Sequence, residues 1–199
     1  MRSKLKAIGV ACRVAILATA GTITFSGMAW ADFFEMPIQG GNGGGFFRVF
    51  CPANTFVVGL QGKSGAIVDH MRLVCAPFTL TANGKNFDAL HSRRFNQGEV
   101  IGESNGGGDD EAICTNGGFV KTIKFNTLFF EEKHLIEHVR ITCTDAGAVS
   151  GTRLFGQFET GGSPATQTCP GGTWLVGLRG RRGSFVDAIG GMCAVMPFK

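Results

Sequence analysis

The sequence CPANTFVVGLQGKSGAIVDHMRLVC, at Cys51–Cys75, returns later in the chain as CPGGTWLVGLRGRRGSFVDAIGGMC, at Cys169–Cys193. A third copy, CTNGGFVKTIKFNTLFFEEKHLIEHVRITC at Cys114–Cys143, has five extra residues near its centre. Each copy has an aromatic residue five positions after its first cysteine and an acid six positions before its second. The aromatic residues are Phe56, Phe119 and Trp174, and the acids are Asp69, Glu137 and Asp187. One such unit is too short to bury a core, so the three copies predict one architecture with pseudo-threefold symmetry.

The first 31 residues have the features of a secretory signal. Arg2, Lys4 and Lys6 give a charged start, an apolar run follows over 14–25, and Ala29–Ala31 matches the small-x-small cleavage rule. We therefore expect cleavage after Ala31 and a secreted or periplasmic protein. The remaining residues, 32–199, suit a single domain.

Removal of that segment changes the charge of the protein. Its four charges are all positive, which leaves 15 of the 19 Lys and Arg against 15 Asp and Glu, so residues 32–199 have a net charge of zero. A nucleic-acid partner is not expected from a chain without excess positive charge. No later stretch approaches the ~18 apolar residues of a membrane span.

The six cysteines after the signal form an even set in an exported chain, which favours disulfides over metal ligands or catalytic thiols. The repeat selects one of the possible pairings, with each bond inside its own copy and bridging the hairpin of that copy. The predicted disulfides are Cys51–Cys75, Cys114–Cys143 and Cys169–Cys193.

The chain is predicted to be all-β. Clusters of glycine lie shortly before the first cysteine of each copy, at 40–45, 106–108 and 161–162, and short β-branched and aromatic segments run between them. The segment Asp69–Cys75 alternates, so that its odd-numbered residues face the core while its even-numbered residues face outward. Glu137–Cys143 repeats this pattern, which places the side chain of His138 outside.

This layout resembles the vitelline membrane outer layer proteins and, more distantly, the jacalin-like lectins, which share the β-prism I fold. The resemblance lies in the cysteine, the aromatic residue, the acid and the second cysteine of each unit, and in a glycine followed by leucine at Gly59 and Gly177 of the first and third units. It implies three pseudo-symmetric antiparallel sheets and the binding of extracellular glycans. The sugar site of the jacalin-like lectins has a Gly-aromatic-x-x-Asp loop, of which Gly183–Asp187 and Gly65–Asp69 are partial matches.

The segment His134–His138 spells H-x-x-E-H, a motif that binds zinc when a helix brings both histidines to one face. Here it aligns with a strand of the other two copies. Residues four apart on a strand are separated by ~13 Å, so we expect no zinc site and no metal. The acids Asp69, Glu137 and Asp187 are expected on three separate sheets, where they accept hydrogen bonds from turn amides as structural residues. Contact with a sugar or an ion is the alternative role for these acids.

Two loops are the candidate ligand-binding regions. The extension of the middle copy presents Phe129, Phe130, Glu131 and Glu132 where the other copies have no equivalent. Packing of the two phenylalanines inside the hairpin is the alternative to a binding role. Asp109 and Asp110 follow a glycine cluster and are candidate ligand-binding residues, including for calcium.

These features together predict a secreted, non-enzymatic binding protein without cofactors, whose function is lectin-like recognition of extracellular glycans. The alternative is a structural or protein-binding module of an extracellular layer that has no sugar site. The expected partner is accordingly a glycan or an extracellular protein.

Overall fold

The computed structural model describes residues 33–80, 87–115, 117–145, 148–156 and 163–196. The predicted signal and its cleavage site lie outside the described residues. In the part of the chain that is described, no helix is long and apolar enough to cross a membrane. One 3-10 turn, η1 (His91–Arg93), stands among the strands of this all-β fold.

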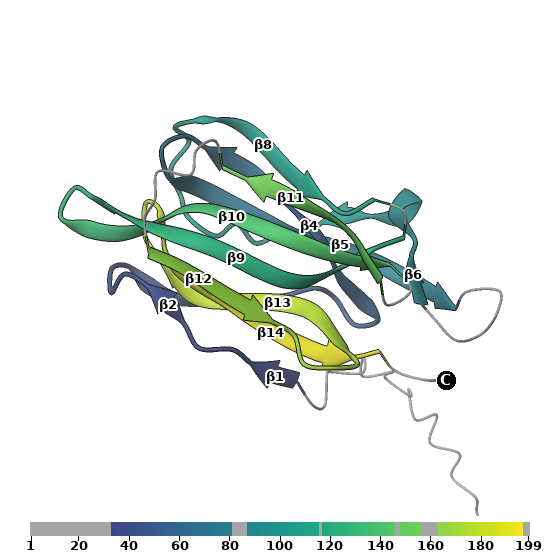
Figure 1. Ribbon diagram of the computed structural model, residues 1–199. Helices are drawn as coiled ribbons and strands as arrows, with labels where there is room; N and C mark the ends of the chain where they lie inside the picture. The colour runs from purple at the N-terminus through teal and green to yellow at the C-terminus, as the bar shows by residue number, and fades with distance from the viewer. Residues whose placement is uncertain (1–32, 81–86, 116, 146–147, 157–162, 197–199) are drawn as a thin grey trace, which may run out of the picture.

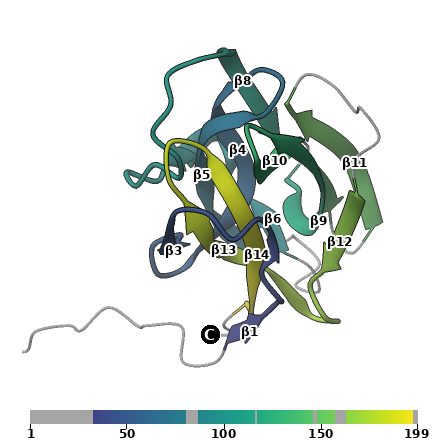
Figure 2. The same cartoon turned by 90° about the vertical axis from the view of Figure 1, so that its left-hand side faces the viewer.

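Three antiparallel sheets, each built on one long hairpin, form the sides of a prism (Figures 1 and 2). The first-repeat sheet has the order β6 (Phe87–Ala89), β5 (Val68–Leu80), β4 (Thr55–Ser64), β8 (Gly108–Ile113), with β7 (Phe95–Asn96) also paired to β5. The middle-repeat sheet has the order β11 (Ala148–Phe155), β10 (Lys133–Asp145), β9 (Phe119–Phe130), β12 (Ser163–Thr168). The third-repeat sheet has the order β1 (Phe33–Glu35), β14 (Val186–Val195), β13 (Thr173–Arg182), β3 (Gly45–Phe50), with β2 (Gln39–Gly40) also paired to β14. These sheets confirm the predicted β-prism with one sheet for each repeat.

The three sheets exchange edge strands in a closed cycle. The strand that precedes the second hairpin, β8, pairs with β4 of the first hairpin. In the same way β12 pairs with β9 of the middle hairpin, and β3 pairs with β13 of the third. Each sheet is thus completed by a strand from the next repeat, and the last by a strand from the first, so no repeat can fold alone.

The disulfides join the predicted cysteines, but they connect sheets instead of bridging a hairpin. Cys51 directly follows β3 of the third-repeat sheet and is bonded to Cys75 on β5 of the first-repeat sheet, with 5.7 Å between the Cα atoms. Cys114–Cys143 and Cys169–Cys193 make the two equivalent links. The prediction of a bridged hairpin was wrong because the strand before each first cysteine belongs to a neighbouring sheet.

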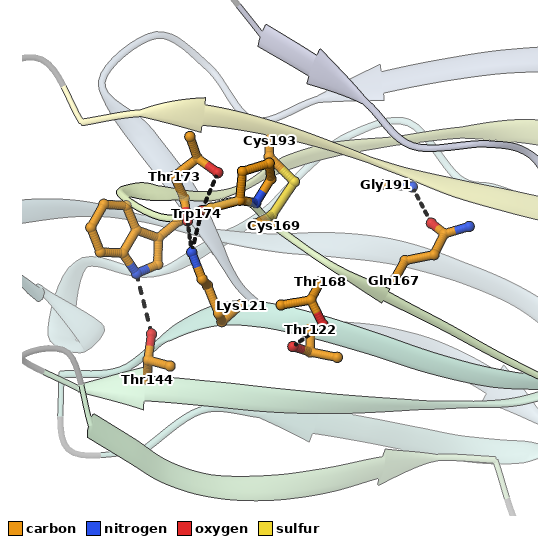
Figure 3. The surroundings of a disulfide bond; sticks show 11 residues. Lys121, Thr122, Thr144, Gln167, Thr168, Cys169, Thr173, Trp174, Gly191 and Cys193 are labelled. Carbon is orange, nitrogen blue, oxygen red and sulfur yellow. Dashed lines mark hydrogen bonds between the residues drawn. A yellow bond between two sulfur atoms is a disulfide. The ribbon is translucent and has the colours of Figure 1, made fainter.

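The surroundings of Cys169–Cys193 show how tightly two sheets are joined (Figure 3). Lys121 on β9 donates through Nζ to the carbonyl oxygens of Pro170 and Thr173, each at 2.6 Å. The buried amide of Gln167 on β12 accepts from the backbone N–H of Gly191 on β14 at 2.9 Å. Polar groups at this seam are therefore paired across it, which fixes the register of one sheet against the other.

Two clusters of apolar side chains fill the prism. The larger contains all six cysteines together with residues from every sheet, among them Leu60, Ile123 and Leu178. The smaller holds Phe56 and Phe119, whose ring centroids are 5.8 Å apart. Trp174 is half-buried against this smaller cluster, and its indole N–H donates to Thr144 Oγ1 at 3.2 Å.

The predicted alternation holds on β5, where Asp69, Met71 and Leu73 are buried while His70 and Arg72 are partly exposed. On β10 the prediction for His138 is wrong, since its side chain is 1% exposed. The end of β11 covers it: a Cβ atom placed on Gly156 would lie 2.5 Å from the His138 Cβ.

Candidate functional site

Each of the three acids is the extra residue of a β-bulge, close to the tip of its hairpin. The pairing passes from Lys63↔His70 directly to Ser64↔Val68, which leaves Asp69 unopposed. Equivalent register shifts leave out Glu137 on β10 and Asp187 on β14. A bulge re-aims a side chain relative to the regular alternation. All three acids are buried, and the three hairpin tips lie at one end of the prism (Figure 1).

The Asp187 cradle consists of Asp187, the glycine loop Gly43–Gly44 and Gly183. A Cβ atom placed on Gly43 would lie 2.1 Å from Asp187 Oδ1, so the Gly43 backbone lies against the carboxylate. A Cβ atom on Gly183 would lie 3.6 Å from the Gly44 Cα and 3.9 Å from Asp187 Oδ2. The carboxylate is therefore enclosed by backbone that carries no side chains.

The Asp69 cradle, made of Asp69, Gly106–Gly107 and Gly65, has nearly the same geometry. A Cβ atom on Gly106 would lie 2.7 Å from Asp69 Oδ1. A Cβ atom on Gly65 would lie 3.6 Å from the Gly107 Cα and 3.9 Å from Asp69 Oδ2, the same distances as in the Asp187 cradle. The two cradles therefore have the same arrangement of an aspartate, a glycine loop and a glycine of the hairpin tip.

Backbone conformation explains why glycine occupies the turn of each loop. Gly44 has φ +59° and Gly107 has φ +60°, in the left-handed region that glycine adopts without strain. A Cβ atom there would also collide with the carbonyl oxygen of Arg182 at 2.1 Å or of Ser64 at 2.4 Å. Both loops therefore need glycine for conformation and for close approach to the hairpin tip.

The middle repeat departs from this arrangement. Its acid is Glu137, and Lys133 takes the place that Gly65 and Gly183 have four residues before the acid. Glu137 Oε2 lies 3.5 Å from His138 Nδ1, and both side chains are 1% exposed. The Gly161–Gly162 cluster of this repeat lies outside the described residues. The described geometry therefore supports two cradles.

The two cradles differ in what surrounds the carboxylate. Ser104 Oγ donates to Asp69 Oδ1 at 2.7 Å, so a protein hydroxyl already occupies that oxygen. Burial raises the pKa of the Asp187 carboxyl above its ordinary value of 3.8, against the lowering effects of Lys133, Arg181 and a hydrogen bond from the Gly183 backbone. A carboxylate beside glycine backbone can accept hydrogen bonds from paired ligand hydroxyls while nearby backbone N–H groups donate to them.

Arg181 holds the glycine loop of the Asp187 cradle in place. Its Nε donates to the carbonyl oxygen of Gly43 at 2.8 Å and its Nη2 to that of Gly44 at 2.9 Å. The equivalent residue of the first repeat, Lys63, instead forms an ion pair with Asp109 at 3.3 Å. The Asp187 cradle is therefore the more rigidly fixed of the two.

The tip of the middle hairpin forms a wall beside the Asp187 cradle. The Phe130 ring packs edge-on against Phe185, which belongs to the loop that carries Asp187, with 6.4 Å between the centroids. A Cβ atom on Gly41 would lie 2.0 Å from the His134 carbonyl oxygen, so the backbones of β10 and the glycine loop are in contact. The five-residue extension thus reaches over a neighbouring repeat.

The predicted ligand-binding residues of this tip are brought close to one cradle. Phe129 is 63% exposed, and its ring contacts that of His134 in a tilted arrangement, with 5.2 Å between the centroids. Glu131 and Glu132 form the exposed turn, with φ of 48° and 64°. Apart from the half-buried Phe130, the tip is open to solvent.

The structure places Asp109 and Asp110 on β8, on a different sheet from that tip. The Asp109 carboxylate is 92% exposed and faces Lys63. Asp110 accepts hydrogen bonds from Ser64 Oγ at 2.8 Å and from the backbone N–H of Gly156 at 2.6 Å. Asp110 therefore joins two repeats.

The H-x-x-E-H segment lies on strand β10, as its alignment predicts. His134 is exposed at the tip whereas His138 is buried under β11. Among the described residues, no group of three or more His, Cys, Asp and Glu side chains could hold a metal ion.

Sequence reasoning assigned Asp69 and Asp187 a structural role and did not bring them together with the glycine clusters. The signal was present: Gly44 and Gly107 each stand seven residues before the first cysteine of a unit, and each acid stands six before the second. What the sequence does not show is that strands β3 and β8 carry these glycines to the sheet of another repeat. That exchange determines which acid each loop covers.

Comparison with known proteins supports the fold. No protein-family model and no curated protein matches the chain. Malaysian banana lectin superimposes with a TM-score of 0.58 at 21% identity, covering 82% of this chain and 99% of the lectin. A mannose-binding jacalin-related lectin from Ananas comosus gives 0.57 at 22% identity, covering 83% and 99%. A mannose-specific jacalin-related lectin from Morus nigra, solved with mannose, gives 0.56 at 18% identity, covering 83% and 96%.

The protein therefore has the β-prism fold of the jacalin-related lectins. The comparisons give no support to the resemblance to vitelline membrane outer layer proteins.

Proposed function

We propose that this protein is a secreted, non-enzymatic lectin that binds a glycan at the Asp187 cradle. The observation that carries the proposal is the fixed carboxylate under a glycine loop, Gly43–Gly44, at the open end of a lectin fold. Solved structures with this fold include complexes with mannose and with a biantennary N-glycan. A glycan is accordingly the expected partner, and we assign its binding to Asp187 and the Gly43–Gly44 loop.

Binding would use the polar groups of the cradle and the apolar wall beside it. Asp187 accepts hydrogen bonds from two sugar hydroxyls, and backbone N–H groups of the loop from 43 to 45 donate to ring and hydroxyl oxygens. The flat rings of Phe129 and Phe130 offer the apolar surface that a pyranose face requires. Glu131 and Glu132 at the rim accept further hydroxyl protons.

The Asp69 cradle is a second, weaker site in this proposal. A sugar hydroxyl must displace Ser104 Oγ from Asp69 before it can bind there. The exchange of one hydrogen bond for another yields little net gain. The two cradles lie at the same end of the prism and are joined by hydrogen bonds. The backbone N–H groups of Glu103 and Ser104, beside the Asp69 cradle, donate to the carbonyl oxygen of Ser184, beside the Asp187 cradle, at 3.0 and 2.6 Å.

A glycan array with the mature protein, followed by calorimetric titration with methyl α-mannoside and with the best glycan found, tests the function. Asp187→Asn is expected to weaken binding by about tenfold to a hundredfold, since hydrogen bonds to a charged group contribute ~1.5–3 kcal/mol. Asp109→Asn is the matched control, because it removes an exposed carboxylate outside both cradles. Full affinity in Asp187→Asn, or an array without any bound glycan, contradicts the proposal.

The alternative function, a protein-binding module without a sugar site, is favoured by one observation, the exposed Phe129 at the tip. Phe129→Ser leaves the cradle intact. Loss of a protein partner in this variant, with no glycan bound by the wild type, would favour the alternative.

A further inference from the structure

A groove of about 400 Å³ runs along the outer face of the third-repeat sheet. Its volume falls within the roughly 300–1,000 Å³ of small-molecule sites. One wall comes from β3, the floor from β13, and the other wall from the segment that runs from β1 to β2. The lining residues are Glu35, Ile38, Phe46, Phe47, Arg48 and Arg179.

The groove begins next to the Asp187 cradle. Phe46 stands two residues after Gly44, and its side chain, at 75%, is the most exposed of the large apolar side chains that the structure describes. The Arg181 guanidinium lies over the Phe46 ring, 4.4 Å from its centroid, and the same guanidinium holds the Gly43 and Gly44 carbonyls. The exposed ring is therefore attached to the rim of the cradle by a shared arginine.

The groove is positively charged in a domain whose overall charge is zero. The guanidinium groups of Arg48 and Arg179 both pair with the single carboxylate of Glu35. Arg48 also lies over the rings of Phe33 and Phe50, at 4.9 and 5.5 Å from their centroids, which fixes its position. Two guanidinium groups therefore share one carboxylate, which leaves the groove with a net positive charge that attracts an anionic group.

We propose that this groove is an extension subsite, which binds an acidic second unit of an oligosaccharide whose terminal sugar lies in the Asp187 cradle. The inference rests on the proposed function. Phe46 stacks on the face of the second sugar, as exposed aromatic rings do. Arg48 and Arg179 donate to its carboxylate, in the bidentate geometry that guanidinium groups offer.

The experiment compares three probes by calorimetry. They are methyl α-mannoside, a neutral mannotriose, and the same trisaccharide with its second mannose, counted from the terminal sugar, replaced by mannuronic acid. The wild type is expected to bind the acidic trisaccharide about tenfold more tightly than methyl α-mannoside, the gain that one aromatic contact and one ion pair typically give. This preference should decrease as salt is added, because partly exposed charges are screened.

Three variants separate the subsite from the cradle. Phe46→Ser should lower the affinity for both trisaccharides toward that for methyl α-mannoside, by the share that the ring contributes, and leave the affinity for methyl α-mannoside unchanged. Phe34→Ser is the matched control, since Phe34 is also exposed, at 51%, on the opposite edge strand of the same sheet, and it should change nothing. Arg48→Gln should remove the preference for the acidic over the neutral trisaccharide, and Arg48→Lys, which keeps the charge but loses the bidentate geometry, should retain only part of it.

The outcomes distinguish this inference from the function on which it rests. Equal affinity of the wild type for all three probes, with methyl α-mannoside still bound, overturns the subsite alone. Equal loss of all three probes in Phe46→Ser also overturns it, because the ring would then act on the cradle. Absence of binding to every probe overturns the subsite and the mannose-type cradle together. A tighter fit to an acidic peptide than to the acidic trisaccharide would assign the groove to a protein partner and refute a glycan subsite.

Discussion

At the scale of single residues, two glycines close together in the loop of the Asp187 cradle differ in the space around them. A Cβ atom on Gly43 would lie 2.1 Å from Asp187 Oδ1, whereas one on Gly45 would meet nothing within 4 Å. Neither residue has a positive φ, so alanine suits the backbone at both positions. The contrast between them is therefore steric and local.

We expect Gly43→Ala to abolish glycan binding at the Asp187 cradle, because the methyl group displaces the carboxylate or the loop. Gly45→Ala is expected to bind as the wild type does. Calorimetric titration of both variants, with circular dichroism to verify the fold, checks this prediction. Similar affinities in the two variants would show that the ligand does not contact this loop.

The raised pKa of Asp187 gives binding a pH dependence. Only the ionised carboxylate accepts two hydroxyl protons, so affinity should be full at neutral pH and fall as the pH drops through the raised pKa, above the ordinary value of 3.8. The folded state binds this proton more readily than the unfolded chain does. Ionisation of Asp187 therefore costs stability at neutral pH, and that cost disappears at acidic pH.

Affinity measured from pH 7 to pH 4 on the wild type checks this prediction, with thermal melting to show that the protein stays folded. An affinity that remains constant over this range would indicate that Asp187 is not the ligand-binding carboxylate.

At the scale of elements, the middle hairpin closes with a turn that its sequence does not favour. Glu131 and Glu132 both have positive φ, at 48° and 64°, as the central residues of a type I′ turn do. Asn and Gly adopt this conformation with much less strain. The acids at this turn are thus retained at a cost in stability, which is consistent with a role at the rim of the cradle.

Replacement of Glu131-Glu132 by Asn-Gly should raise the free energy of unfolding by about 1 kcal/mol. Denaturant titration measures the gain. A decrease in stability would mean that the glutamates make contacts that outweigh the backbone strain, and glycan binding by the same variant shows whether the acids contribute to recognition.

The elements also show where sequence reasoning stops. The strands of Cys51–Cys75 and its copies were predictable, because alternation and glycine punctuation are local signals. The route of β3 was not, since its partner β13 lies more than a hundred residues away. The bulges at the three acids were equally hidden, because a bulge is a property of two paired strands. Consequently the sequence identified the three acids by their recurrence before the second cysteine of each unit, whereas their enclosure by glycine loops became visible only in the structure.

At the scale of the whole molecule, stability depends on links between sheets. The disulfide Cys169–Cys193 ties the middle-repeat sheet to the third-repeat sheet. Its closure restricts the unfolded chain, an effect of ~3 kcal/mol for loops of this length. In the folded state it also maintains the seam at which Gln167 and Lys121 are paired.

Cys169→Ala combined with Cys193→Ala should therefore lower the free energy of unfolding by about 3 kcal/mol. Denaturant titration under non-reducing conditions measures this. A loss confined to one sheet, seen as early hydrogen exchange in β12 alone, would show that the sheets are less coupled than the strand exchange implies.

The direction of the chain through the prism has a practical consequence. The hairpin tips lie at one end, and the first and last described strands meet at the other, where Phe33 pairs with Ala194 beside Trp174 (Figure 1). An attachment made at the end where these strands meet leaves both cradles at the opposite end, away from the support. A sensor surface that captures the protein by a terminal tag therefore displays both cradles in one common orientation, whereas random coupling through the lysines, of which Lys133 lies at a tip, would mask the cradles in part of the population.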